Sequence, residues 1–240
     1  MPFGLLSGNF IPTFGTMGQT YENKPSQEGS REPPAVRPEG FSLTGPEARL
    51  LSDPSWILTK NRVMEKAQIL LGSLQQEIAR LPSVQHFPHY PAGTLERGPK
   101  ISRGEYYQGL PYCILDYPRS FSREEVFALR TMLWWGNFFS CTLHVSGAAK
   151  SVLKESLLRA ALDRMGFSGW RICIHPDPWQ HHGEGDNYQA LETLKEEKIE
   201  QLIREKPFCK LSLQVPLEQW DTFVVQAASS YDRLMEDLSR

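Results

Sequence analysis

The chain has 240 residues, 26 of them basic and 28 acidic, which gives a formal net charge of -2. A chain of this length can bury enough surface to fold without a metal or disulfide bonds. With 40% hydrophobic, 11% aromatic and 22% charged residues, the composition is typical of globular proteins and far from collagenous, disordered or membrane classes. The near-neutral charge creates no field that would attract nucleic acid or an anionic membrane, so we expect neither as a partner.

The start of the chain does not have the pattern of a secretory signal. Residues 1–15 lack a basic segment, and Gly4, Gly8 and Pro12 interrupt their apolar residues, whereas a signal needs a basic start and an unbroken apolar run. The longest apolar stretches, such as residues 132–139, are too short to span a bilayer. We therefore expect a cytoplasmic protein.

Residues 1–46 are rich in proline and glycine, and residues 22–39 mix charged and polar types without hydrophobic periodicity. This composition predicts a disordered or loosely docked N-terminal tail. Its first part is apolar, with Phe3, Phe10 and Phe14 among others, and could dock onto the chain's own domain or onto another protein. Residues 47–240 are then predicted to form a single domain.

Hydrophobic periodicity predicts five helices in this domain. A capping box formed by Ser122 and Glu125 marks the start of one of them, and Gly136 marks its end. The expected helices cover residues 53–81, 122–135, 148–165, 186–207 and 220–238.

Four short runs of β-forming residues are predicted strands, over residues 112–117, 137–146, 170–175 and 208–215. Each contains one of the four cysteines, Cys113, Cys141, Cys173 and Cys209. Their wide spacing offers no CxxC pair for zinc, and disulfides would need export, for which there is no signal. We therefore expect reduced thiols buried in the core. The preceding residues 83–109 are predicted to form a long ordered loop.

The run over residues 137–146 alternates, with Cys141 and Leu143 on one face and Thr142 and His144 on the other. Strands that are polar on one side favour a sheet with helices on one face over a doubly wound sheet. The predicted fold is α+β, a single domain with an about four-stranded, mostly antiparallel or mixed sheet and helices packed on one face.

The polar sides of three predicted strands would share the other face of that sheet. They carry Ser140, Thr142, His144, Arg171, Cys173, His175, Lys210, Ser212 and Gln214. A merely solvated face is one interpretation. The other is a binding concavity with aromatic walls, covered by residues 83–109 and the tail.

The candidate site on this face combines a histidine with charged and aromatic residues near the strand ends. His144 is the candidate catalytic acid or base, because imidazole exchanges protons near neutral pH; a structural histidine is the alternative. An arginine could orient an anionic ligand through its bidentate fork or form an ordinary ion pair. The candidate ligand-binding residues are Tyr112, Asp116, Arg119, Trp134, Arg171 and His175.

Two further site types are tested by their spacing. His86, His89, His175, His181 and His182 could hold a metal by number alone, but they match no established ligand pattern, so no metal is predicted. The junction from Ser146 to Ser151 lies between a strand and a helix, as a P-loop does, but lacks its glycines, which excludes nucleotide hydrolysis there. Free amides and Lys150 leave an anion site at this helix start as an alternative.

Residues 104–119 and 130–137 carry a distinctive set of glycine, aromatic and proline residues. The set is Gly104, Tyr107, Gly109, Leu110, Pro111, Tyr112, Leu115, Asp116, Tyr117, Pro118, Arg119, Arg130, Thr131, Met132, Trp134, Trp135, Gly136 and Asn137. It resembles segments of uncharacterised bacterial proteins, chiefly from Bacteroidota. The resemblance implies a bacterial cytoplasmic protein and brings no activity, cofactor or catalytic residue.

The function predicted from these features is small-molecule binding by a soluble domain, with the site on the polar face of the sheet. An enzyme would be a special case of this function, and the sequence names neither a reaction nor a cofactor. The alternative is a protein-interaction module that uses the apolar N-terminal segment or the surface of the terminal helix.

Overall fold

The computed structural model describes residues 40–163 and 166–240. The chain divides into two units, residues 1–49 and 50–240. Of the first unit, residues 40–49 are described, and they include the start of helix α1 (Gly45–Ser52). The predicted tail, residues 1–46, therefore lies almost entirely outside the described residues. No helix in the described part of the chain is both long and apolar enough to cross a membrane.

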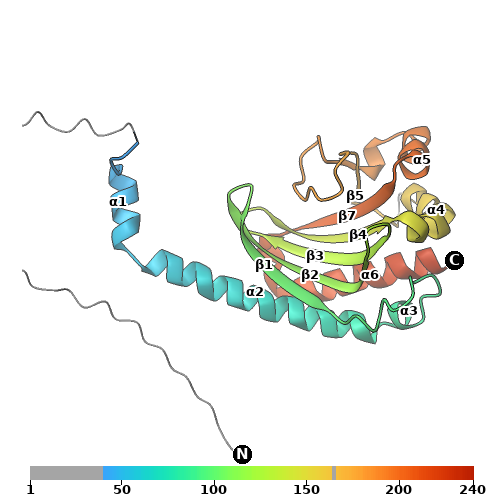
Figure 1. Cartoon of the computed structure of the whole chain (residues 1–240), viewed down its shortest axis with the longest axis horizontal. Coiled ribbons are helices and arrows are strands. Elements are labelled where there is room, and N and C mark those ends of the chain that lie inside the picture. Colours follow the sequence, from blue (N-terminus) through green and yellow to red (C-terminus); the bar gives the residue numbers. More distant parts are fainter. Residues whose placement is uncertain (1–39, 164–165) are drawn as a thin grey trace, which may run out of the picture. The chain divides into compact units, whose positions relative to one another are not determined.

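The second unit is built on one seven-stranded sheet (Figure 1). Every strand pairs antiparallel with its neighbours. In spatial order the strands are β1 (Lys100–Tyr107), β2 (Leu110–Phe121), β3 (Val126–Trp134), β4 (Phe138–Ser146), β7 (Phe208–Pro216), β5 (Trp170–Cys173) and β6 (Tyr188–Ala190). The predicted α+β fold with a single antiparallel sheet is confirmed, whereas the prediction of about four strands is wrong.

Two of the additional strands lie in segments for which the sequence predicted a different structure. Strand β1 lies inside the predicted loop over residues 83–109, and β6 opens the predicted helix over residues 186–207. The rest of that helix is the short turn η1 (Leu191–Thr193) and helix α5 (Glu196–Glu205). Both strands lie at the sheet's ends, where pairing with one neighbour suffices to form a strand whose own sequence has little β character.

Strand β3 replaces the helix predicted after Ser122. The Ser122 hydroxyl accepts hydrogen bonds from the amides of Glu124 (3.3 Å) and Glu125 (2.9 Å), as a helix cap would. The Ser122 amide also donates to the Glu125 carbonyl (2.9 Å), and Phe121 pairs with Val126 across the two strands, so the same residues close a hairpin. Because β3 is buried on both faces, its nearly continuous apolar run could not be told from a buried helix by periodicity.

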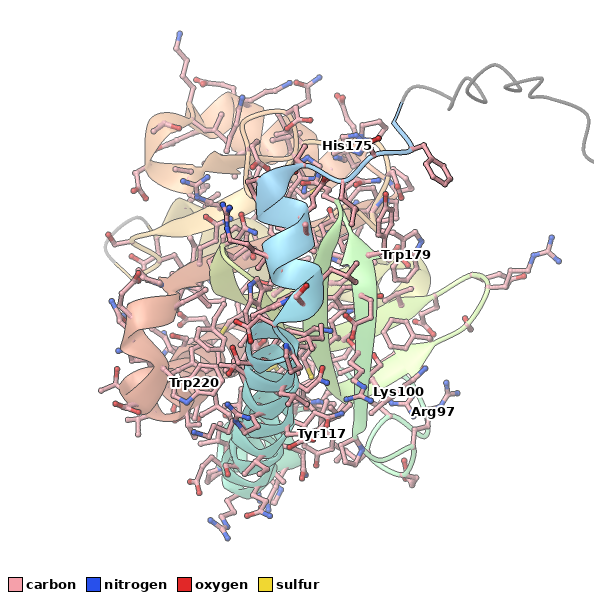
Figure 2. All side chains as sticks on the ribbon, turned by 90° about the vertical axis from the view of Figure 1, so that its left-hand side faces the viewer. Arg97, Lys100, Tyr117, His175, Trp179 and Trp220 are labelled. Atoms are coloured by element: carbon pink, nitrogen blue, oxygen red, sulfur yellow. The ribbon has the colours of Figure 1, made fainter. Side chains whose placement is uncertain are left out.

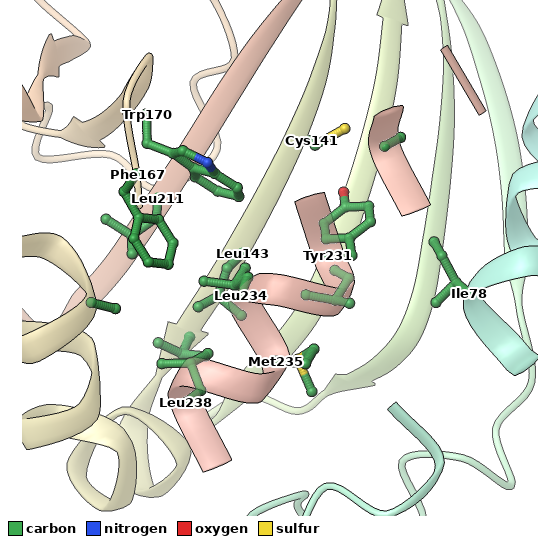
Figure 3. Packing of buried hydrophobic residues seen from close by; sticks show 14 of the residues in the cluster. Ile78, Cys141, Leu143, Phe167, Trp170, Leu211, Tyr231, Leu234, Met235 and Leu238 are labelled. Carbon is green, nitrogen blue, oxygen red and sulfur yellow. The ribbon is translucent and has the colours of Figure 1, made fainter. Parts of the chain in front are cut away.

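Helices cover one face of the sheet, as predicted. They are α2 (Ser55–Arg80), the short α3 (Pro82–Gln85), α4 (Gly147–Leu162), α5 and α6 (Phe223–Ser239), with the turn η2 (Leu217–Thr222) leading into α6. Figure 3 shows Cys141 and Leu143 of β4 facing Tyr231, Leu234 and Leu238 of α6. Apolar side chains from all the longer helices join one cluster with this face of the strands, and their burial is the main source of stability.

The four cysteines are buried free thiols, which confirms that prediction for the described chain. Burial raises the pKa of Cys113 to about 11 and the pKa of both Cys141 and Cys209 to about 12, so these thiols stay protonated and unreactive. Cys173 belongs to a separate cluster with Tyr188 and Phe208. It lies on the face that the sequence predicted to be polar.

One polar side chain from a helix enters the core of the sheet. The hydroxyl of Tyr231, which is fully buried, accepts from the Thr142 amide (3.1 Å) and donates to the Arg130 carbonyl (2.9 Å). It therefore bridges β3 and β4. The Thr131 hydroxyl lies 2.9 Å away as a further partner, which satisfies the buried phenol.

We predict that Tyr231→Phe destabilises the domain by about 1–3 kcal/mol, because it leaves the Thr142 amide and the Arg130 carbonyl buried without their partner. Urea denaturation followed by circular dichroism measures this difference. Tyr106→Phe is the matched control, because Tyr106 is 87% exposed, and it should change stability little. Equal stability of Tyr231→Phe and wild type would contradict the bridging role.

Candidate functional site

The polar face of the sheet is covered by residues 174–187, the segment between β5 and β6, which we call the strap. Figure 1 shows it beside β5, on the side of the sheet away from α2. The Lys210 ammonium on β7 donates to the carbonyls of Pro178 (2.9 Å) and Gln180 (2.6 Å), and Arg171 on β5 donates to the Gly183 carbonyl (3.0 Å). The predicted cover, residues 83–109, instead contributes β1 to the sheet.

Tyr107 of β1 binds the middle of the strap. Its hydroxyl accepts from the amides of His181 (2.7 Å) and His182 (3.0 Å) and lies 3.1 Å from Nδ1 of His182. The Asn187 side chain donates to the His182 carbonyl (2.6 Å). The strap has no regular secondary structure of its own, so side chains of the sheet and hydrogen bonds within the strap together satisfy its backbone groups.

Lys210 is a buried cation, with 1% of its surface exposed. In the described chain its ammonium donates to two carbonyls and to no carboxylate. Burial, which disfavours the charged form, lowers its pKa to about 8. The strand therefore carries a positive charge under the strap at neutral pH.

Asp116 and Arg130 form a bidentate ion pair on this face. Arg130 donates from Nε to Oδ1 (2.7 Å) and from its terminal nitrogen to Oδ2 (3.0 Å) of Asp116. The guanidinium carbon lies 5.6 Å from the ring centres of both Phe121 and Trp179, within range of a cation–π interaction. Asp116 is thus engaged by a neighbouring strand.

His144 of β4 lies beneath the strap and is 3% exposed. Its ring meets the rings of Trp179 (5.3 Å between centroids) and Phe208 (6.0 Å) edge-on. Burial, followed by the charges of Lys210 and Arg130, lowers the His144 pKa to about 3. The ring is therefore neutral at physiological pH, so it can form hydrogen bonds but does not titrate in this range. Its Nε2 is buried and has no hydrogen-bond partner within the described residues.

A pocket of about 390 Å³ opens beside His144, at one end of the sheet; we call it the His144 pocket. Four segments meet there: the β2–β3 turn, the β4–α4 junction, the strap and the α5–β7 junction. Its lining consists of Ser122, Arg123, Glu124, Val126, His144, Ser146, Gly147, Pro176, Pro178, Trp179, Pro207 and Phe208.

Gly147 allows two of these segments, the β2–β3 turn and the start of α4, to lie close together. It has φ +61°, and a Cβ atom there would lie 2.2 Å from the Glu124 carbonyl oxygen. A side chain at this position would push the β2–β3 turn away from the start of α4. The rim of the His144 pocket therefore depends on a glycine at the first position of the helix.

The remaining predicted ligand-binding residues do not meet at one cavity. Arg119 donates to the carbonyls of Gly98 (3.1 Å) and Arg97 (3.3 Å). Tyr112 and Trp134 pack in a small apolar cluster at the β1–β2 end. His175 accepts the Asp177 amide at Nδ1 (3.0 Å) within the strap. Of the seven predicted site residues, only His144 lines the His144 pocket.

Sequence reasoning missed Trp179, which forms a wall of the pocket and is 47% exposed. Trp179 lies in a stretch of prolines and histidines with no periodic signal. Figure 2 shows it with His175 on the strap, well apart from Trp220 near the helices. Lys210 was placed on the correct face, although its role in holding the strap had no sequence signal.

A second hollow of about 600 Å³ lies between the start of α2 and the β1–β2 hairpin. Trp56, Leu110 and Trp135 give it mainly apolar walls, and the ion pair between Lys60 and Glu105 lies at its side. We call it the α2 groove. It is separate from the His144 pocket and shares no lining residue with it.

Among the described residues, no three histidine, cysteine or acidic side chains are grouped as ligands for a metal ion. Comparison with known proteins found no matching family model, curated protein or solved structure. The resemblance to bacterial proteins therefore stays a prediction, and the geometry has to support any functional proposal by itself.

The low pKa of His144 predicts acid sensitivity. An unfolded histidine has a pKa near 6.5, whereas folded His144 has a pKa of about 3. As pH falls below 6.5 the unfolded state binds a proton that the folded state does not, so stability falls. His144→Phe should remove about 2 kcal/mol of the loss between pH 7 and pH 4.5.

Chemical denaturation of wild type and variant across this pH range measures that difference. His86→Phe is the control, because His86 is exposed, and its stability should follow wild type. If the His144→Phe variant lost stability in acid as steeply as wild type, the buried neutral state of His144 would be wrong.

Proposed function

We propose that this domain binds a small molecule in the His144 pocket. The observation that carries the proposal is Nε2 of His144, a buried polar atom that has no hydrogen-bond partner among the described residues, in a residue that lines the pocket. Buried polar atoms almost always have a hydrogen-bond partner, and leaving one unpaired costs about 1–3 kcal/mol. A ligand that reaches Nε2 would supply the missing partner.

The walls of the pocket support the same proposal. Ligand sites are concave, mostly apolar and carry few oriented polar groups. Trp179, Phe208 and three prolines supply apolar surface around His144. The Arg130 guanidinium lies within cation–π range of the Trp179 ring and so favours one position of this ring before a ligand binds, which reduces the entropy lost on binding.

The proposal predicts ligands whose binding depends on Trp179. A thermal-shift screen of a metabolite collection should yield compounds that raise the melting temperature of wild type. Trp179→Ala should weaken these compounds at least about tenfold in calorimetric titration, because it removes the aromatic wall.

Trp56→Ala is the matched control, because Trp56 is 48% exposed and lines the α2 groove instead. It should leave the affinities unchanged. A screen without any stabilising compound, or compounds that bind wild type and Trp179→Ala equally, would refute small-molecule binding at this pocket.

The second candidate function is protein interaction, and the α2 groove favours it. In the described sheet β1 pairs only with β2, and Tyr106 on β1 is 87% exposed. An extended apolar segment of another protein could pair with β1 and place side chains against Trp56. The terminal helix is less suited, because its apolar face is buried in the core.

Selection from a library of extended peptides tests this second function. Apolar peptides should be enriched on wild type, and the selected peptides should bind Trp56→Lys at least about tenfold more weakly, because the lysine charge is costly to bury. Trp179→Lys, a change in an equally exposed tryptophan of the strap, should bind them normally. If the selected peptides bound both variants as tightly as wild type, the α2 groove would be excluded as their site.

A further inference from the structure

Helix α4 begins at the wall of the His144 pocket, and its first turn is positive. Ser146 and Gly147, at the helix start, both line the pocket. Within the described residues, the Ser146 side chain makes no capping hydrogen bond, and the first turn contains no acidic residue. The first amides of a helix have no partner inside the helix and carry partial positive charge. Lys150, also in this turn, adds a full charge where a negative one would be favourable.

A second, independent feature of the same pocket is His144, three residues before the first residue of the helix. His144 is 97% buried, and its Nε2 has no partner among the described residues. The ring is neutral, so as the Nε2–H tautomer it donates one hydrogen bond. His144 of β4 and the first residue of α4 therefore line the same pocket.

The charges around the pocket add to a positive potential at its base. The charges of Lys210 and Arg130 both act on His144. Arg130 is neutralised by Asp116, with which it pairs, whereas Lys210 has carbonyl partners in the described chain. At the rim, exposed Arg123 and Glu124 carry opposite charges. Asp177 and Lys206 also act on Lys210, and their charges are opposite in sign. The buried cation and the helix start are therefore the main contributions to the potential.

We infer that the His144 pocket binds an organic oxyanion, a phosphate or carboxylate attached to a flat apolar body. The anionic group binds the first amides of α4 and Nε2–H of His144. The body lies against Trp179 and Phe208. This inference rests on the proposed small-molecule function and names the chemical class of its ligand.

Five simple probes separate the features of this ligand. Phenyl phosphate and benzoate carry both the anion and the ring, inorganic phosphate carries only the anion, and benzyl alcohol and benzylamine present the ring with no charge or a positive charge. Calorimetric titration at low salt should give the tightest binding for phenyl phosphate, with benzyl alcohol and benzylamine at least about tenfold weaker. Phenyl phosphate should shift the NMR amide signals of Gly147 and Ala148.

Substitutions in the pocket test the assigned contacts. His144→Gln keeps an N–H donor at a similar reach and should stay within about threefold of wild type, whereas His144→Phe should lose at least about tenfold. Glu124→Gln removes the negative charge at the rim and should tighten binding of phenyl phosphate by about two- to fivefold. Glu65→Gln, an exposed change on α2, should leave binding unchanged. Melting temperatures confirm that each variant is folded.

Each contrary result has a distinct meaning. If benzyl alcohol or benzylamine binds through Trp179 as tightly as phenyl phosphate, the oxyanion is refuted and small-molecule binding stands. If phenyl phosphate binds His144→Phe and wild type equally, the assignment of the anion to His144 and α4 is refuted. If neither these probes nor any screened compound binds, both the inference and the proposed function are refuted.

Discussion

The hydrogen bonding of the buried Lys210 ammonium to the strap is the interaction on which the candidate site depends. A charge inside a protein needs hydrogen-bond partners, and the described chain supplies them as the carbonyls of Pro178 and Gln180. These two bonds hold the strap on the sheet. The strap in turn carries Trp179 over His144 and Arg130. The wall of the His144 pocket that Trp179 forms is therefore held in place by the hydrogen bonds of Lys210.

The two faces of the sheet are buried by different means. On one face, helices bury apolar side chains, and Tyr231 is the polar group that reaches into the strands. On the other face, an irregular segment turns backbone groups toward the sheet. Lys210 and Arg171 donate to its carbonyls, and the Tyr107 hydroxyl accepts from its amides. Most of the named polar residues on this face therefore form the hydrogen bonds that allow the strap to be buried. Among the described residues beneath the strap, Nε2 of His144 is a buried polar atom without a hydrogen-bond partner, and the proposed ligand would supply one.

Burial and positive charge act on His144 in the same direction, and both keep its ring neutral. An oxyanion bound at the start of α4 would oppose them, because a negative charge nearby favours the imidazolium. Ligand binding and the protonation of His144 are then linked. In the proposed complex the bound anion raises the pKa of His144 toward neutral pH, which is the condition for acid–base chemistry.

The sequence by itself determined the parts of the protein that follow from local periodicity. The alternation around Cys141 assigned His144 and Thr142 to one face of β4, and the apolar stripes of α2 and α6 marked the helix face. Only the tertiary structure decided the rest. Ser122 signals a helix start in isolation, but pairing of Phe121 with Val126 makes it part of a hairpin turn. The sequence pattern could not reveal this, because β3 is buried on both faces and therefore shows no strand period. Lys210 binds the carbonyls on either side of Trp179, of Pro178 and Gln180, and contacts between segments so distant in the chain leave no trace in local sequence patterns.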